Sequence, residues 1–237
     1  MSSHHTNPHS RLAPAARLLI ERIHRAGRPP MEALTPAQAR EFYNIGGPIL
    51  DLQPPPKVGR VEDITVPVRD GHHCAARLYA PHSDSPLPVL LYLHGGGFTV
   101  GSLTTHDVLC RQLSSQGHCA VVSLDYRLAP EHRFPTALHD AWDALNWLRE
   151  QGAALGLDTK RLAIGGDSAG GTLSAVCALM ARDAGLPLAL QLLFYPGCTG
   201  RNDLPSHQAY GQGFLLDVST IDWFFNHYID EADRDDW

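Results

Sequence analysis

The chain has 237 residues, of which 43% are hydrophobic and 19% are charged, a composition that can bury one sizeable globular core. Its formal charge of −6 and the absence of a basic block argue against nucleic acid as a partner. The first residues contain no apolar run of the length that a signal peptide or a membrane span needs. We therefore expect a cytoplasmic protein with no membrane span.

Cysteine and histidine contents bear on redox state and on metal binding. The five cysteines are odd in number and widely spaced, which favours reduced thiols over a disulfide framework. Fourteen histidines suggest a metal, but no HExxH or comparable ligand spacing occurs. We expect neither a metal site nor an organic cofactor.

Two helices are predicted ahead of the first strand. Apolar residues recur at helical spacing from Leu12 to Arg25, and Gly27 ends that segment. Thr35 is typical of an N-cap and Pro36 of the first helical position, so a second helix should run to about Tyr43. We expect these helices to cover a core that begins later in the chain.

Strands begin at Val61. Two alternating runs separated by a turn at Asp70 and Gly71 predict an antiparallel pair within residues 61–80. Strands and helices then alternate, which is typical of a mostly parallel sheet with helices on both faces. The strands are predicted at 89–93, 119–126, 162–164 and 189–195, and the intervening helices at 105–117, 137–150 and 169–183.

The last part of the chain yields no further predicted strand. Residues 204–213 are expected to form a loop, residues 218–229 a helix, and the remainder a charged end. The predicted organisation is N-terminal cap helices and a linker at 1–56, an α/β core at 57–200 and a cap-type segment at 201–237.

Gly166, Ser168 and Gly170 fit the pattern GxSxG between a short apolar run and an amphipathic stretch. A strand-to-helix elbow with these glycines would hold the serine clear of neighbouring side chains, as a nucleophile requires. On this pentapeptide alone, a glycine-rich buried turn with an incidental serine stays open as the alternative.

A second motif, HGGGF at residues 94–98, follows the predicted buried strand directly. Consecutive glycines leave peptide N–H groups unobstructed, and acyl transfer needs such donors for the negative charge that develops on the carbonyl oxygen. A flexible loop would instead predict glycines scattered among serine and asparagine.

Together with DYRLAPEHRFP at 125–135 and GDSAGG at 166–171, HGGGF resembles the hormone-sensitive-lipase-like family of α/β-hydrolase esterases. The resemblance covers residues from about 60 to 196 and implies an α/β-hydrolase fold with a helical cap. It implies that Ser168 is the nucleophile.

By the same resemblance, the N–H groups of Gly96, Gly97 and Ala169 form the oxyanion hole, and His94 and Asp167 fix the glycine loop. The segment from Tyr126 to Pro135 would buttress the site, with Glu131 and Arg133 in ion pairs, although a surface loop stays open for its side chains.

The rest of a catalytic triad is missing from the expected places. In this fold the acid and the histidine follow the serine, but neither family motif for them occurs, and only His207 and His227 come after Ser168. We expect the catalytic Asp and His beyond residue 237, the last strands of the sheet to be missing, and the strand at 189–195 to be left as an apolar edge. The 237 residues would then be a fragment, or would be completed by another chain, and would show little turnover alone.

These features predict a carboxylic ester hydrolase that acts on small-molecule esters with short to medium acyl chains through an acyl-enzyme. The alternative is a non-catalytic small-molecule-binding or regulatory protein on the same scaffold, which the absent triad members would favour. A homodimer is the assembly that the resemblance suggests.

Overall fold

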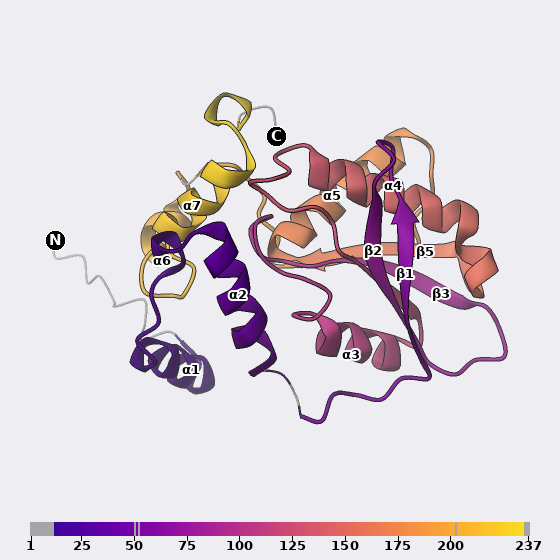
Figure 1. The fold of residues 1–237 in the computed structure, drawn as a ribbon, viewed down its shortest axis with the longest axis horizontal. Helices are drawn as coiled ribbons and strands as arrows, with labels where there is room; N and C mark the ends of the chain where they lie inside the picture. Colours follow the sequence, from indigo (N-terminus) through magenta and orange to yellow (C-terminus); the bar gives the residue numbers. More distant parts are fainter. Residues whose placement is uncertain (1–11, 50, 52, 202, 235–237) are drawn as a thin grey trace, which may run out of the picture.

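The computed structural model describes residues 12–49, 51, 53–201 and 203–234. Its strands are β1 (Arg60–Pro67), β2 (His73–Ala80), β3 (Leu87–Leu93), β4 (Ala120–Leu124), β5 (Leu157–Asp167) and β6 (Leu190–Phe194). They form one sheet in the order β1-β2-β4-β3-β5-β6 (Figure 1). The first two strands are antiparallel to each other, β2 is antiparallel to β4, and the other neighbours are parallel. The predicted mostly parallel sheet is confirmed.

Helices cover both faces of this sheet (Figure 1). The helices are α1 (Pro14–Arg25), α2 (Pro36–Gly46), α3 (Asp107–Gly117), α4 (Thr136–Gln151), α5 (Ser168–Asp183), α6 (Pro205–Tyr210) and α7 (Val218–Tyr228), with short 3-10 turns at Met31–Ala33, Gly47–Ile49, Gly152–Leu155 and Glu231–Asp233. Leu90 and Tyr92 of β3 pack with Cys110 of α3, whereas Leu91 and Leu93 join the core that contains residues of α4 and α5. This alternation follows from the two-residue period of a strand.

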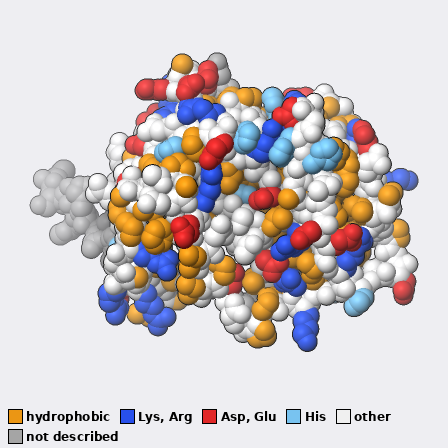
Figure 2. Space-filling view, in the orientation of Figure 1, with side chains coloured by type: hydrophobic (Ala, Val, Ile, Leu, Met, Phe, Trp, Pro, Cys, Tyr) orange, Lys and Arg blue, Asp and Glu red, His pale blue; other side chains and the backbone are white. Residues whose placement is uncertain are grey.

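Four helices lie to one side of the sheet and come from both ends of the chain. In Figure 1, α1, α2, α6 and α7 lie together on the left. Glu32 accepts hydrogen bonds from the hydroxyls of Ser219 (2.7 Å) and Thr220 (2.8 Å) in the first turn of α7, so the N-terminal and C-terminal segments are joined directly. Figure 2 shows hydrophobic side chains gathered over this side of the molecule. The division of the chain at residues 56 and 200 stays a prediction.

The structure confirms most predicted elements, with shifted ends. Thr35 caps α2 in a capping box with Gln38, as its position before Pro36 predicted. Helix α3 begins at Asp107 rather than at 105, because the hydroxyl of Thr105 accepts a hydrogen bond from the Ser102 N–H in the preceding turn. Strand β6 lies at the edge of the sheet, and the exposed fraction of Leu190 is 55%, as expected for an apolar edge strand.

One predicted element is wrong. Residues 204–213 were expected to form a loop, but Pro205–Tyr210 form α6. Pro205 supplies the fixed φ of a first helical turn, and its missing N–H costs nothing there. Among the described residues, none of the helices has both the length and the apolar character needed to cross a membrane.

Candidate active site

The serine lies at a sharp junction between a strand and a helix. Strand β5 ends at Asp167 and α5 begins at Ser168, whose φ is +49°. Positive φ is unusual for a residue with a side chain and marks local backbone strain. A Cβ added to Gly166 or to Gly170 would collide with the carbonyl oxygen of Leu93. The two glycines therefore allow the elbow to pack against the end of β3.

The glycine loop that follows β3 is also held in conformations that favour glycine. The φ angles are +121° at Gly96 and +55° at Gly97. The carbonyl of Gly96 accepts hydrogen bonds from the N–H groups of Thr99 (3.0 Å) and Val100 (2.9 Å), which closes the loop into a turn. In the described part of the chain, the N–H groups of Gly96, Gly97 and Ala169 donate to no acceptor and so are free for a ligand.

Asp167 joins the elbow to the glycine loop. Its carboxylate accepts hydrogen bonds from the Tyr92 hydroxyl (2.7 Å) and the Gly95 N–H (3.0 Å). Nε2 of His106 lies 3.2 Å from Oδ1 of the same carboxylate. Burial raises the pKa of Asp167, but the hydrogen bonds from His106, Tyr92 and Gly95 outweigh it, so this pKa lies below its ordinary value of 3.8. The carboxylate is therefore ionised at neutral pH.

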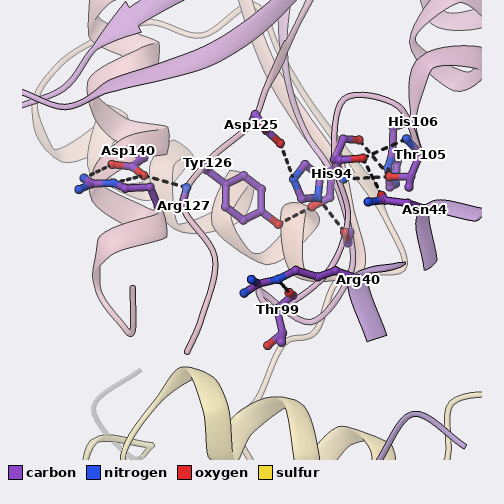
Figure 3. A network of polar contacts seen from close by, with 12 residues as sticks. Arg40, Asn44, His94, Thr99, Thr105, His106, Asp125, Tyr126, Arg127 and Asp140 are labelled. Carbon is purple, nitrogen blue, oxygen red and sulfur yellow. Dashed lines mark hydrogen bonds and ion pairs between the residues drawn. The ribbon is translucent and has the colours of Figure 1, made fainter. Parts of the chain in front are cut away.

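His94 is fully buried at the base of the loop. Its ring stacks on Tyr126 at 4.3 Å, and the Tyr126 hydroxyl donates to the His94 carbonyl oxygen at 2.6 Å (Figure 3). Burial, together with the nearby His106, lowers the pKa of His94 to about 4. The imidazole is therefore neutral at neutral pH, and its contacts are packing and hydrogen bonding with the loop.

Arg40 joins α2 to the glycine loop. Its Nε donates to the carbonyl oxygen of Thr99 at 2.8 Å (Figure 3). One terminal nitrogen donates to the carbonyl oxygen of Ala129 at 2.7 Å. Its guanidinium also pairs with Glu131, which confirms the ion pair expected there and lowers the pKa of Glu131 to about 2. One side chain therefore positions α2 over the loop.

The other predicted ion pair holds α7. Arg133 pairs with Asp230 and donates to the carbonyl oxygens of Asn226 and His227, each at 3.0 Å. The ring of Phe98, at the end of the glycine motif, stacks on buried Tyr228 at 3.9 Å. Segment 125–135 therefore anchors the end of α7 as well as the loop.

Both motifs open on one cavity of about 490 Å³, whose wall includes Gly97, Ser168 and Ala169. Gly96 is the neighbour of Gly97 in the loop, whereas His94 and Asp167 are buried and do not line the cavity. Most of the remaining wall is apolar and comes from residues 195–199 after β6, from α6 and from α7. Phe224 of α7 lies against Gly97 so closely that a Cβ there would overlap its ring.

Three residues of this site, Tyr92, His106 and Arg40, were not singled out from the sequence. Tyr92 carried a usable signal, because a tyrosine in a strand buried on both faces needs a partner for its hydroxyl. His106 and Arg40 only fell within the helices predicted at 105–117 and from Pro36 to about Tyr43, with no role given to either side chain. Nothing in their local sequence indicates contacts with residues some 60 positions away in the chain.

The histidines that follow the elbow differ in position. His207, on α6, lines the cavity. His227 does not, and its Nδ1 lies 2.7 Å from the carbonyl oxygen of Trp223 within α7. In the described part of the chain, neither histidine forms an ion pair with a carboxylate.

Comparison with known proteins agrees with this geometry. A family model described as the alpha/beta hydrolase fold matches residues 90–237. The chain is 42% identical over 225 residues to ethyl acetate hydrolase of Pseudomonas putida, which covers 91% of this chain. This chain belongs to the alpha/beta hydrolase fold family. Esterase LipI of Mycobacterium tuberculosis is a second relative within this family, 47% identical over 161 residues and 66% of this chain.

Solved structures of other alpha/beta hydrolases superpose closely. LAE6, an enzyme from the metagenome of Lake Arreo in Spain, gives a TM-score of 0.89 at 36% identity and covers 94% of this chain. An esterase from Pyrobaculum calidifontis gives 0.84 at 36% identity and covers 94%. These relatives confirm the predicted family of ester hydrolases, and none of those named here is described as a non-catalytic binding protein.

The chain is shorter than its relatives. It spans 70% of the ethyl acetate hydrolase and 50% of LipI, and 71% of each of the two solved chains.

Proposed function

We propose that this protein is a carboxylic ester hydrolase in which Ser168 is the nucleophile and the N–H groups of Gly96, Gly97 and Ala169 hold the oxyanion. The main observation that supports this proposal is that Ser168, Gly97 and Ala169 line one cavity, while the three N–H groups have no acceptor among the described residues. In the reaction, a base takes the proton of the Ser168 hydroxyl as its oxygen attacks the ester carbonyl, and negative charge develops on the carbonyl oxygen. The C–O bond to the alcohol then breaks, and the base returns the proton to the departing alkoxide. Water then releases the acid from the acyl-enzyme.

His94 and Asp167 act in this proposal as positioning residues. Asp167 holds Gly95 by its N–H, and His94 packs under the loop, so the following glycines present their N–H groups in a fixed direction. Fixed donors need no reorganisation as charge develops, and each lowers the activation free energy by about 3 to 4 kcal/mol.

We place the catalytic base and its orienting carboxylate outside residues 1–237. Support comes from His227, which lies on α7 away from the cavity, and from His207, which lines the cavity without a carboxylate partner among the described residues. The predicted preference for short to medium acyl chains also stays a proposal, supported by the moderate size of the cavity. A cytoplasmic location, pairing of two copies and the lack of nucleic acid binding stay predictions from the sequence.

Active-site labelling tests the nucleophile directly. A fluorophosphonate probe, added to a longer form of the chain that also carries the base and followed by peptide mass spectrometry, should modify Ser168. In the same longer form, hydrolysis of p-nitrophenyl butyrate should fall by several orders of magnitude in Ser168→Ala, whereas residues 1–237 alone should show little turnover. Ser115→Ala is the matched control, because this serine lies on α3 and donates to the carbonyl of Gln112 in its own helix. Equal rates for this longer form with and without the Ser168→Ala change would reject the proposal.

A further inference from the structure

The ring of Phe224 covers the part of the glycine loop that contains Gly97. A Cβ added to Gly97 would overlap three atoms of this ring, Cγ, Cδ1 and Cδ2, so the Gly97 backbone and the ring are in direct contact. Both residues also line the cavity that contains Ser168. Phe224 is half-buried, so part of its surface is open to a ligand in that cavity.

Contacts at both ends of α7 hold this ring in place. In the first turn, the hydroxyls of Ser219 and Thr220 donate to the Glu32 carboxylate at 2.7 and 2.8 Å. At the other end, the carbonyl oxygen of Tyr228 accepts a hydrogen bond from the Phe134 N–H at 2.7 Å, and the Tyr228 side chain is buried. The ring lies on the stretch of helix between these two anchors. It is therefore a wall that cannot easily retreat from a substrate.

The same loop determines where an ester must lie. For the Gly97 N–H to hold the developing negative charge, the carbonyl oxygen of the ester must lie about 3 Å from its nitrogen. That nitrogen is bonded to the Cα against which the Phe224 ring packs. The carbon atoms next to the ester group, on the acyl side and on the alcohol side, are only a few bonds from the carbonyl oxygen. One of them consequently lies beside the ring, where a branch would need room that the ring occupies.

We infer that Phe224 is a specificity-determining residue that selects esters with an unbranched carbon next to the ester group, on the side of the ester that faces α7. This inference rests on the proposed function, because it takes the glycine loop as the oxyanion hole. A methyl branch is close in volume to one methylene, and one methylene in a hydrophobic pocket changes kcat/KM by about 10- to 200-fold. Selection by overlap requires a fixed wall, which the anchored helix provides.

Two pairs of isomeric esters test the inference in a longer form of the chain that also carries the base. The esters p-nitrophenyl butyrate and p-nitrophenyl 2-methylpropanoate differ by a branch on the acyl side. Propyl butyrate and 2-propyl butyrate differ by a branch on the alcohol side. The measured quantity is the ratio of kcat/KM between the unbranched and the branched ester of each pair. Comparing this ratio between wild type and variants removes the intrinsic reactivity of the esters.

For at least one pair, this ratio should be about 10-fold lower in Phe224→Ala than in wild type. If Phe224→Ala does not fold, Phe224→Val keeps a smaller apolar side chain, and there the ratio should fall by about threefold or more. Phe42→Ala is the matched control, because it removes a phenyl ring from α2 that is exposed and outside the cavity wall. This control should keep the wild-type ratio.

Three results would overturn the inference. The first is a ratio that is unchanged or higher for both pairs in the folded Phe224 variants. The second is an equal loss of rate on all four esters, because Phe224 would then position the glycine loop without selecting among substrates. The third is a fall in Phe42→Ala as large as that in Phe224→Ala, because the effect would not depend on the ring against Gly97.

Failure of the proposed function gives a different result. If the longer form hydrolysed none of the four esters, their dissociation constants would be measured by isothermal titration calorimetry with wild type and Phe224→Ala. Tighter binding of an unbranched ester than of its isomer, lost in Phe224→Ala, would support the role of Phe224 without hydrolysis. Equal affinities within both pairs, or a preference that Phe224→Ala retains, would overturn it.

Discussion

Replacing Asp167 by alanine tests the contact between the elbow and the glycine loop. The change leaves the Tyr92 hydroxyl and the Gly95 N–H without their acceptor, in a region where both residues are buried. Each unpaired buried donor costs about 1 to 3 kcal/mol, so Asp167→Ala should lower the free energy of unfolding by about 2 to 6 kcal/mol. A domain has about 5 to 15 kcal/mol in total, so the loss should be easy to measure.

The assay is guanidinium unfolding followed by tryptophan fluorescence, compared across wild type and five variants. Asp167→Asn keeps one side-chain oxygen as an acceptor and should lose less than Asp167→Ala. In Tyr92→Phe the donor itself is removed, and in the double variant the two losses should not add, with a coupling of about 1 to 3 kcal/mol. Asp158→Ala, which removes an exposed ion pair with Arg161, is the control and should change little.

The pH dependence gives a second check. Because the folded-state pKa of Asp167 lies below 3.8, its ionised form stabilises the fold above pH 3.8, and this contribution is lost as the pH falls below that value. The difference between wild type and Asp167→Ala should therefore shrink in acid. A loss in Asp167→Ala no larger than that in Asp158→Ala, or additive losses with Tyr92→Phe, would refute the reasoning.

Three further changes probe the packing around the site. Gly170→Ala places a methyl group against the Leu93 carbonyl and should destabilise the fold by about 1 to 3 kcal/mol or more, as thermal unfolding would show. Arg40→Met frees α2 from the loop and should increase proteolysis of α2. Without Arg40 the pKa of Glu131 rises from about 2, so the stability lost relative to wild type should diminish as the pH falls from 4.5 towards 2. Tyr228→Leu removes a buried stacked ring and should lower the free energy of unfolding, measured by chemical denaturation, by about 2 to 4 kcal/mol. For each of the three variants, an assay that shows no change would contradict the packing described.

The sequence by itself determined the order and type of most elements. Apolar periodicity places α4 and α5, and the continuous apolar run of β3 marks a strand buried on both faces. The two glycine motifs also predicted local backbone geometry. The positive φ at Gly97 and the close approach of Leu93 to Gly170 are conditions that glycine allows, so a local sequence pattern can indicate them. Segment 204–213 was mistaken for a loop because a six-residue helix is too short to show a helical period.

Only the tertiary structure decided how these pieces meet. Tyr92, Gly95 and His106 converge on Asp167 because parallel strands β3 and β5 end side by side, and Arg40 reaches the loop from a helix about 60 residues earlier. Local sequence encodes backbone conformation, whereas hydrogen bonds between distant side chains depend on how the sheet orders its strands.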